Sequence, residues 1–209
     1  MDNLTVIYYT SNREQEGFED NIRKTLLKTI GDLPLISVSQ KPIDFGRNIC
    51  VGDIGATPEN MLLQVMSGAV EAKTKFVGMA ESDCLYHKSY FEFRPDSEDT
   101  FYYPDECYLL WVGNRNRKYW RYHRREISSI VGREHLIKII GKILLQSPKH
   151  IRNIVPKLTK QETFHPDYPV ISIKTRDGMH WASAYSREYE TELPFWGRPK
   201  ELLKEYGIR

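Results

Sequence analysis

The amino-acid sequence predicts an α/β protein with a mostly parallel central sheet flanked by helices and a smaller antiparallel section in its second half. Two strand–helix steps indicate this class, one over residues 4–39 and one over residues 57–80. In both steps a uniformly apolar strand adjoins a stretch with apolar side chains at helical spacing. Uniformly apolar strands are typical of a sheet that is covered on both faces, as parallel sheets are.

The composition favours one globular domain over residues 1–209. The chain is 40% hydrophobic, with 30 Lys and Arg against 28 Asp and Glu, so it is no polycation as a whole. Cys50, Cys84 and Cys107 are widely spaced, which predicts neither a disulfide framework nor a cysteine zinc site. A reducing, cytoplasmic location follows, or the host cytoplasm if a phage encodes the chain. No signal peptide and no apolar run long enough for a membrane span is expected.

The first step begins with a strand over residues 4–9. Small polar residues, Thr10, Ser11 and Asn12, end this strand and leave backbone N–H groups available to a ligand. A helix with one apolar stripe is expected over residues 18–30, followed by a second strand over residues 35–39. Strand, helix and strand together form the unit of a parallel sheet.

An irregular loop over residues 40–49 follows the second strand and carries Gln40 and Arg47. In open α/β sheets, ligands bind beyond the carboxyl ends of the strands. The sequence therefore leaves two interpretations of Arg47 open, a phosphate contact and a surface arginine. Gln40 is expected beside the ligand with the residues that end the first strand.

The second step carries paired acids to the same edge of the sheet. Thr57 and Pro58 predict a helix start, and a strand over residues 76–80 then runs into Glu81-Ser82-Asp83. Two carboxylates at this place are either the start of a solvated turn or ligands of a hard divalent ion. Mg²⁺ or Mn²⁺ prefers such oxygen ligands and can share its shell with a diphosphate, whose charge it neutralises.

Several stretches together resemble a known family. They are residues 37–42, Gly46-Arg47-Asn48, residues 68–72, and Glu81-Ser82-Asp83 with Leu85-Tyr86 after it. In their order they are similar to small GT-A fold glycosyltransferases of the family 2-like group, over roughly residues 4–140. The resemblance implies a nucleotide-binding half over residues 1–86, and an acceptor half with a C-terminal extension over residues 87–209.

The resemblance also implies an activity. Such enzymes move a sugar from a nucleoside diphosphate sugar, here expected to be a UDP-sugar, to an acceptor hydroxyl. Glu81 and Asp83 match the two acidic positions of the family's Asp-x-Asp motif, which holds the metal and the donor. The sequence departs from that motif by carrying Glu in place of the first Asp. His180 matches a histidine that many GT-A enzymes bring back to the metal, and its alternative is a histidine without such a role.

The catalytic base is expected in the second half. Strands over residues 101–103 and 108–112 are predicted to be antiparallel, with Asp105 and Glu106 in the connection between them. An inverting transferase needs one base near the acceptor hydroxyl, and these two residues are candidates unless they only form a charged turn. A helix over residues 136–144 follows, with Glu134 as another possible base and Arg133 matching an arginine of the family.

Residues 115–125 combine six Lys or Arg, one His and three aromatic side chains. Such a segment can stack on bases and bind phosphates, or its charges can be solvated. Two alternatives to the glycosyltransferase therefore stay open. One is a nucleotidyltransferase that uses Glu81 and Asp83, and the other is a nucleic-acid-binding module that uses residues 115–125. The segment also suggests DNA with hydroxymethylated bases as the acceptor, as for some bacteriophage glucosyltransferases.

Overall fold

The computed structural model describes residues 3–113, 117–122, 128–145, 157–175, 177 and 187–208. Among these residues, none of the helices has the length and apolar character that a bilayer crossing requires. The elements in chain order are β1 (Leu4–Thr10), α1 (Glu16–Ile30), β2 (Leu35–Ser39), β3 (Arg47–Cys50), α2 (Pro58–Glu71), β4 (Phe76–Glu81), β5 (Cys84–Leu85), α3 (Lys88–Glu92), β6 (Thr100–Pro104), β7 (Cys107–Trp111), β8 (Tyr119–Arg121), β9 (Ile130–Gly132), α4 (Arg133–Leu145), β10 (Lys160–Phe164), β11 (Val170–Lys174), β12 (Tyr189–Glu190) and α6 (Pro199–Glu205).

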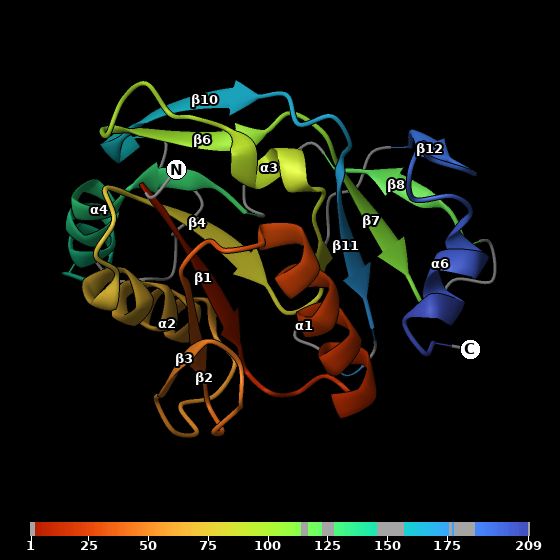
Figure 1. Cartoon of the computed structure of the whole chain (residues 1–209), viewed down its shortest axis with the longest axis horizontal. Helices are drawn as coiled ribbons and strands as arrows, with labels where there is room; N and C mark the ends of the chain where they lie inside the picture. Colours follow the sequence, from red (N-terminus) through yellow and green to blue (C-terminus); the bar gives the residue numbers. More distant parts are fainter. Residues whose placement is uncertain are drawn as a thin grey trace.

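Two sheets form the body of the protein (Figure 1). The larger has the order β10-β6-β9-β4-β1-β2-β3, and β1 pairs in parallel with both β2 and β4. Only β9 runs antiparallel to its neighbours in this sheet, β4 and β6. The smaller sheet has the order β12-β8-β7-β11-β5 and is mostly antiparallel. The predicted α/β class, with a mostly parallel sheet and a smaller antiparallel section, is confirmed.

Helices cover both faces of the larger sheet. On one face, α2 and α4 bury apolar side chains such as Val65 and Ile139 against strand residues such as Ile7 and Val131. On the other face, α1 contributes Leu26 and Ile30 to a second apolar cluster. Helix α2 starts where the sequence predicts, because the Thr57 hydroxyl accepts a hydrogen bond from the Asn60 backbone N–H.

Gly132 marks a close approach of two backbones at the end of β9. A Cβ atom at this position would stand 2.3 Å from the Glu98 carbonyl oxygen and 2.9 Å from the Glu98 Cα and carbonyl carbon. The segment before β6 therefore lies against β9 at a distance that only glycine allows. Gly132 thus fixes how closely β6 and β9 can pack.

The C-terminal residues fold onto the smaller sheet. Helix α6 packs Leu202 and Leu203 into an apolar cluster that also holds Phe18 of α1. The indole of Trp196 donates a 2.8 Å hydrogen bond to the Pro169 carbonyl oxygen, just before β11. Helix α6 is therefore part of the folded body (Figure 1).

The predicted antiparallel pair over residues 101–112 is wrong. Its first strand, β6, lies in the larger sheet and its second, β7, lies in the smaller sheet. The two residues between them carry the chain from one sheet to the other, so they are not a hairpin turn. Strands β3 and β10 were also not predicted, because both are short and lack an apolar run.

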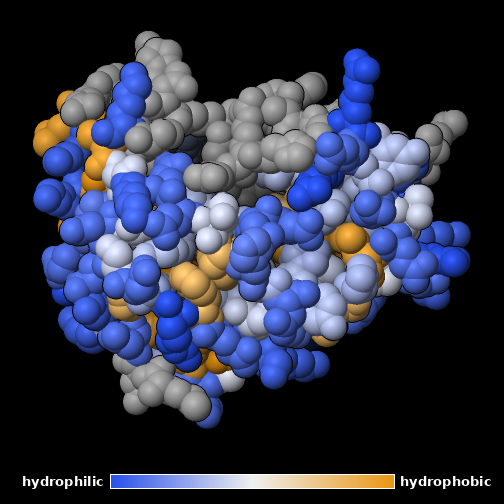
Figure 2. Space-filling model, turned by 90° about the horizontal axis from the view of Figure 1, so that it is seen from above, coloured by the Kyte–Doolittle hydropathy of each residue, from blue (hydrophilic) through white to orange (hydrophobic). Residues whose placement is uncertain are grey.

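The surface gives no sign of a large apolar docking area on the face drawn in Figure 2. Hydrophilic residues dominate that face, and the hydrophobic ones form small separate groups. This face therefore resembles the ordinary surface of a globular protein.

Candidate functional site

The carboxyl ends of β1, β2 and β4 meet at one edge of the larger sheet. In the parallel ladders Thr10 pairs with Ser39, and Tyr9 pairs with Glu81. This is the edge at which open α/β sheets bind ligands. The strands predicted over residues 4–9, 35–39 and 76–80 therefore end at one edge of the sheet, as expected.

Side-chain hydrogen bonds hold the loops at this edge together. Asn12 has a φ of 53°, in the left-handed region, and its Oδ1 accepts from the backbone N–H groups of Gln40 and Lys41, both at 2.8 Å. The Thr10 hydroxyl accepts from the Asn12 N–H at 2.9 Å, and the Gln40 side chain donates to the Gly55 carbonyl. The structure thus brings Thr10, Asn12 and Gln40 together, with Ser11 between the first two.

A buried ion pair lies at the end of β4. Asp83 is 2% exposed and Lys174 is 4% exposed. The Lys174 Nζ donates to Asp83 Oδ2 at 2.7 Å, and the Cys84 thiol donates to Asp83 Oδ1 at 3.3 Å. Burial alone would lower the pKa of Lys174, but Asp83 and the other nearby acidic groups outweigh burial and raise it above its usual value. The lysine is therefore charged beside an acid.

Strand β11 carries the lysine to this position. It pairs antiparallel with the two-residue strand β5, so that Cys84 lies opposite Ser172. The Ile173 N–H also donates to the Asp83 carbonyl at 2.7 Å. Lys174 was not predicted as a site residue, because a lysine that ends a strand is usually solvated.

Glu81 is held by groups from three segments. Its backbone N–H donates to the Tyr86 hydroxyl at 3.0 Å, and that hydroxyl is also hydrogen-bonded to Ser128. Burial, followed by the Asp83 charge, raises the pKa of Glu81 to about 7, while Lys174 and hydrogen bonds from Tyr9 and the Ser128 backbone oppose the rise. Ser128 has a φ of 56°, which is rare for a serine and indicates local strain at this site.

A third acid, Glu14, completes what we call the carboxylate centre, defined as Glu14, Glu81, Asp83 and Lys174. The Thr175 hydroxyl donates to Glu14 Oε2 at 2.5 Å, whereas Oε1 is buried without a hydrogen-bond partner among the described residues. Burial raises the pKa of Glu14 to about 7. Glu14 was not predicted as a site residue, because it lies in a loop of mixed charges.

The raised pKa of Glu81 predicts a pH dependence of stability. In the folded state Glu81 keeps its proton up to about pH 7, whereas the same carboxyl in the unfolded chain loses it near pH 4.5. The folded state thus binds more protons in this window, and stability falls as pH rises through it. We expect Glu81 alone to lower the free energy of unfolding by about 1 kcal/mol between about pH 6 and about pH 8, and Glu14, whose pKa is also raised to about 7, to add a drop of similar size.

Urea unfolding of the Glu81→Gln variant at these two pH values checks this. Glutamine does not titrate, so the drop should shrink, with Glu14 supplying the remainder. Glu134→Gln changes an exposed acid at the other edge of the sheet and should keep the parent's slope. A Glu81→Gln variant with the full slope would contradict the prediction.

The carboxylate centre fits a divalent ion poorly. The ligand atoms of Glu81, Asp83 and Cys84 lie within 4.8 Å of one another. However, burial raises the pKa of the Cys84 thiol, so it stays protonated, and Mg²⁺ and Mn²⁺ prefer oxygen ligands. Lys174 already binds Asp83, and two unit charges of one sign at 4 Å repel by about 4 kcal/mol at an effective dielectric constant of about 20. A divalent ion would roughly double this repulsion.

Two candidate residues lie away from the end of β4, one at the start of β3 and one just after β9. Arg47 begins β3, pairs with Ile36 near the start of β2, and forms a 2.7 Å ion pair with Glu71. Glu134 follows Gly132, which pairs with the first residue of β4, and its side chain is 72% exposed. The length of β4, roughly 17 Å, separates Gly132 from Glu81. Arg47 lies level with Met79 across the ladders, on the edge strand β3, three strands away from β4. The phosphate contact of Arg47 and the role of Glu134 as a base stay predictions, and neither side chain is joined by a described contact to the acids at the end of β4. Arg133, beside Glu134, donates to the Ala72 carbonyl.

The other candidate bases have different partners. Asp105 is bonded to His165 Nδ1 at 2.7 Å, and Glu106 forms a 3.2 Å ion pair with Arg121. Both acids lie where the chain passes between the sheets, and no described contact joins either of them to the carboxylate centre. His180 lies outside the residues that the structure describes, so its role stays a prediction.

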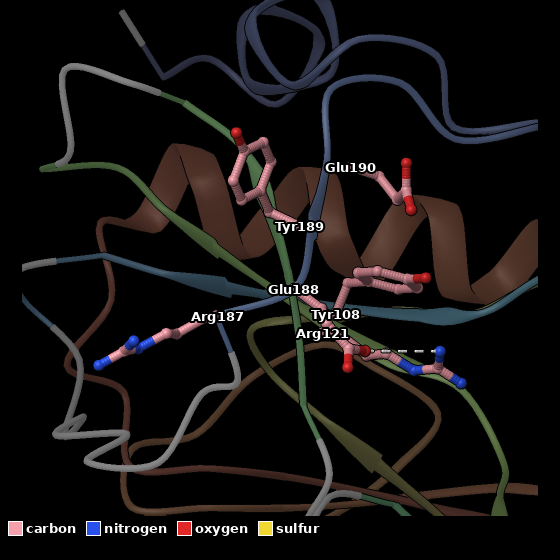
Figure 3. Close-up of a pocket in the computed structure, with 6 residues that line it drawn as sticks. All are labelled: Tyr108, Arg121, Arg187, Glu188, Tyr189 and Glu190. Atoms are coloured by element: carbon pink, nitrogen blue, oxygen red, sulfur yellow. Dashed lines mark ion pairs between the residues drawn. The ribbon is translucent and has the colours of Figure 1, made fainter.

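Over its described residues, 117–122, the basic aromatic segment makes contacts with other parts of the same chain. Tyr119 is fully buried, Lys118 Nζ lies 3.3 Å from the centre of the Tyr189 ring, and Arg121 pairs with Glu106 and Glu188. Figure 3 shows Arg121 and Glu188 in a surface hollow with Arg187 and Tyr189. Tyr108, which also lines it, pairs with Ile171, three residues before Lys174 on β11. The hollow is therefore separate from the carboxylate centre.

Comparison with known proteins finds likeness in structure alone. No family model matches the chain, and neither does a curated protein. A glycosyltransferase involved in the glycosylation of the major capsid of PBCV-1 superposes with a TM-score of 0.51 at 8% identity, over 81% of this chain and 92% of that one. A cytidylyltransferase from Leptospira borgpetersenii has a TM-score of 0.50 at 10% identity, over 79% of this chain and 76% of that one.

The bifunctional IspDF from Campylobacter jejuni gives a TM-score of 0.49 at 13% identity, and the match covers 78% of this chain and 50% of that protein. The chain therefore spans about half the length of that protein. At such identities the likeness shows the fold, which is the GT-A-like fold of nucleotide-diphospho-sugar transferases. The fold that the sequence resemblance implied is confirmed.

Proposed function

We propose that the chain is a nucleotide-sugar-dependent glycosyltransferase that moves a sugar from a nucleoside diphosphate sugar to an acceptor hydroxyl. The observation that carries the proposal is the Glu81-Ser82-Asp83 motif at the carboxyl edge of the parallel strands, beside the loops of Thr10 and Gln40. This is the edge at which a nucleotide binds in sheets of this kind. A UDP-sugar is the donor expected from the resemblance.

The division of work follows from the positions of the residues. Thr10, Ser11, Asn12 and Gln40 frame the nucleotide side, where Asn12 locks two loops together. The carboxylate centre lies next to it and faces the diphosphate. No base is assigned, because Asp105 and Glu106 are bound to His165 and Arg121.

A second candidate function is nucleotidyl transfer. The match to a cytidylyltransferase has a TM-score of 0.50, against 0.51 for the glycosyltransferase, so the fold alone favours neither. The two candidates differ in their nucleotide. A glycosyltransferase binds a nucleoside diphosphate and its sugar conjugate, whereas a nucleotidyltransferase binds a nucleoside triphosphate.

A nucleotide panel in a thermal-shift assay tests the proposal. UDP and UDP-sugars at about one hundred times their dissociation constant should stabilise the fold by roughly 2.7 kcal/mol. That corresponds to a rise in melting temperature of several degrees for a chain of this size. Stabilisation by CTP or other triphosphates alone would replace the glycosyltransferase with the nucleotidyltransferase. The panel is run with Mn²⁺, with Mg²⁺ and with EDTA, because the sequence predicts a metal.

The Asp83→Asn variant links binding to the site. We expect it to lose the stabilisation by UDP, while Asp167→Asn, an exposed change outside the carboxylate centre, keeps it. An Asp83→Asn variant that binds and turns over donor like the parent would refute the assignment. The acceptor prediction has its own test, which is sugar transfer to hydroxymethylated DNA in parallel with glycan acceptors.

A further inference from the structure

We infer that Lys174 takes the place of the divalent ion at the carboxylate centre, so that the protein binds its donor without a metal. The inference rests on the proposed function for the identity of the donor. The Lys174 ammonium itself occupies the position in which the Glu81-Ser82-Asp83 motif predicts a cation.

The contacts of Asp83 support the inference first. Its Oδ2 is bound by the Lys174 ammonium at 2.7 Å and its Oδ1 accepts from the Cys84 thiol. The acid that the motif provides as the surest metal ligand therefore already has a cation. This cation is covalently part of the chain and is buried, so solvent does not exchange it for a dissolved ion.

The surroundings of the ammonium support it second. Asp83 and Glu81 both act on Lys174 electrostatically, and Glu14 interacts with it from the loop after β1. Two acids from the end of β4 and one from the loop after β1 thus act on one positive charge. Burying a charged lysine is favourable only with acidic partners of this kind. The lysine in turn supplies the acids with a counter-ion, so they do not require an external cation.

The backbone supports it third. The pairing of β5 with β11 and the bond from Ile173 N–H to the Asp83 carbonyl hold Asp83, in the turn between β4 and β5, against the strand that carries Lys174. A positive charge beside Asp83 is therefore built into the fold.

The experiment measures Mn²⁺ uptake and UDP binding on the full chain. Electron paramagnetic resonance counts free Mn²⁺ during titration of the parent, Lys174→Met, Lys174→Arg and the control Lys160→Met, which changes an exposed strand lysine. We expect the parent, Lys174→Arg and Lys160→Met to bind no Mn²⁺ at the site. Lys174→Met should bind one ion at least tenfold more tightly than the parent.

Calorimetry with UDP is then done in EDTA and in Mn²⁺. The parent should bind UDP equally well in both, while Lys174→Met should bind it in Mn²⁺ and lose at least tenfold in EDTA. Stoichiometric Mn²⁺ binding by the parent, or a folded Lys174→Met that takes up no more Mn²⁺ than the parent, overturns the inference. If Lys174→Met fails to fold, the parent and Lys174→Arg still decide the question.

The outcomes separate this inference from the proposed function. UDP binding that requires Mn²⁺ leaves the proposed function standing and overturns the role of Lys174. The absence of UDP binding in both conditions refutes the proposed function, and the titration with Mn²⁺ alone still decides whether the lysine occupies the cation position.

Discussion

Replacing Lys174 with methionine should lower the free energy of unfolding by about 3–5 kcal/mol, the usual cost of removing one partner of a buried ion pair. Methionine fits the volume of the lysine stem but leaves the Asp83 carboxylate, 2% exposed, without its ammonium. Urea unfolding of parent and variant at neutral pH measures the loss. Lys160→Met, at an exposed ion pair with Glu162, should change stability by less than about 1 kcal/mol.

A double-mutant cycle separates the ion pair from lost packing. Asp83→Asn combined with Lys174→Met removes both charges, so it should be less destabilised than the sum of the two single variants. The surplus measures the coupling between the ammonium and the carboxylate. Strictly additive losses would show that the two groups do not interact in the folded protein.

Changing Gly132 to alanine should destabilise the fold by about 1–3 kcal/mol, the usual range for overpacking. The new Cβ would meet the Glu98 backbone at 2.3 Å, and a backbone cannot rotate away as a side chain can. Strand β9 joins β4 to β6, so any shift there disturbs the middle of the larger sheet. The melting temperature should fall by roughly 2–4 °C for each kcal/mol.

Gly141→Ala is the matched control for this change. Gly141 lies within α4, and a Cβ there meets no atom within 4 Å. Alanine has the higher helix propensity, so this variant should gain roughly 0.5–1 kcal/mol. A Gly132→Ala variant as stable as the parent would show that the two backbones separate at little cost.

The parallel half of the fold could be predicted because its signals are local. Thr57 and Pro58 mark the start of α2 by their own chemistry, and the apolar run of residues 76–80 defines β4 without any knowledge of its neighbours. The edge position of Glu81 then follows from the rule that parallel strands end together. This reasoning needs only short stretches of chain.

The centre of the candidate site could not be predicted in the same way. Lys174 acquires its role from Asp83, which is 91 residues away, and nothing near the lysine in sequence indicates a buried acid. The local structure at Arg47 was missed for a related reason, since Gly46 and Pro42 suggest a loop, whereas β3 starts at Arg47 and pairs with β2. Pairing between distant segments decided both cases.

The link between Asp83 and Lys174 also bears on how the chain can fold. An N-terminal fragment that ends near residue 86 would contain β1, β2 and β4, but its Asp83 would lack the ammonium that β11 supplies. During synthesis Asp83 therefore remains unpaired with Lys174 until β11 is made, about ninety residues later. Contacts of such sequence separation slow folding. Residues 1–86 and residues 87–209 are therefore not expected to reach their native states independently.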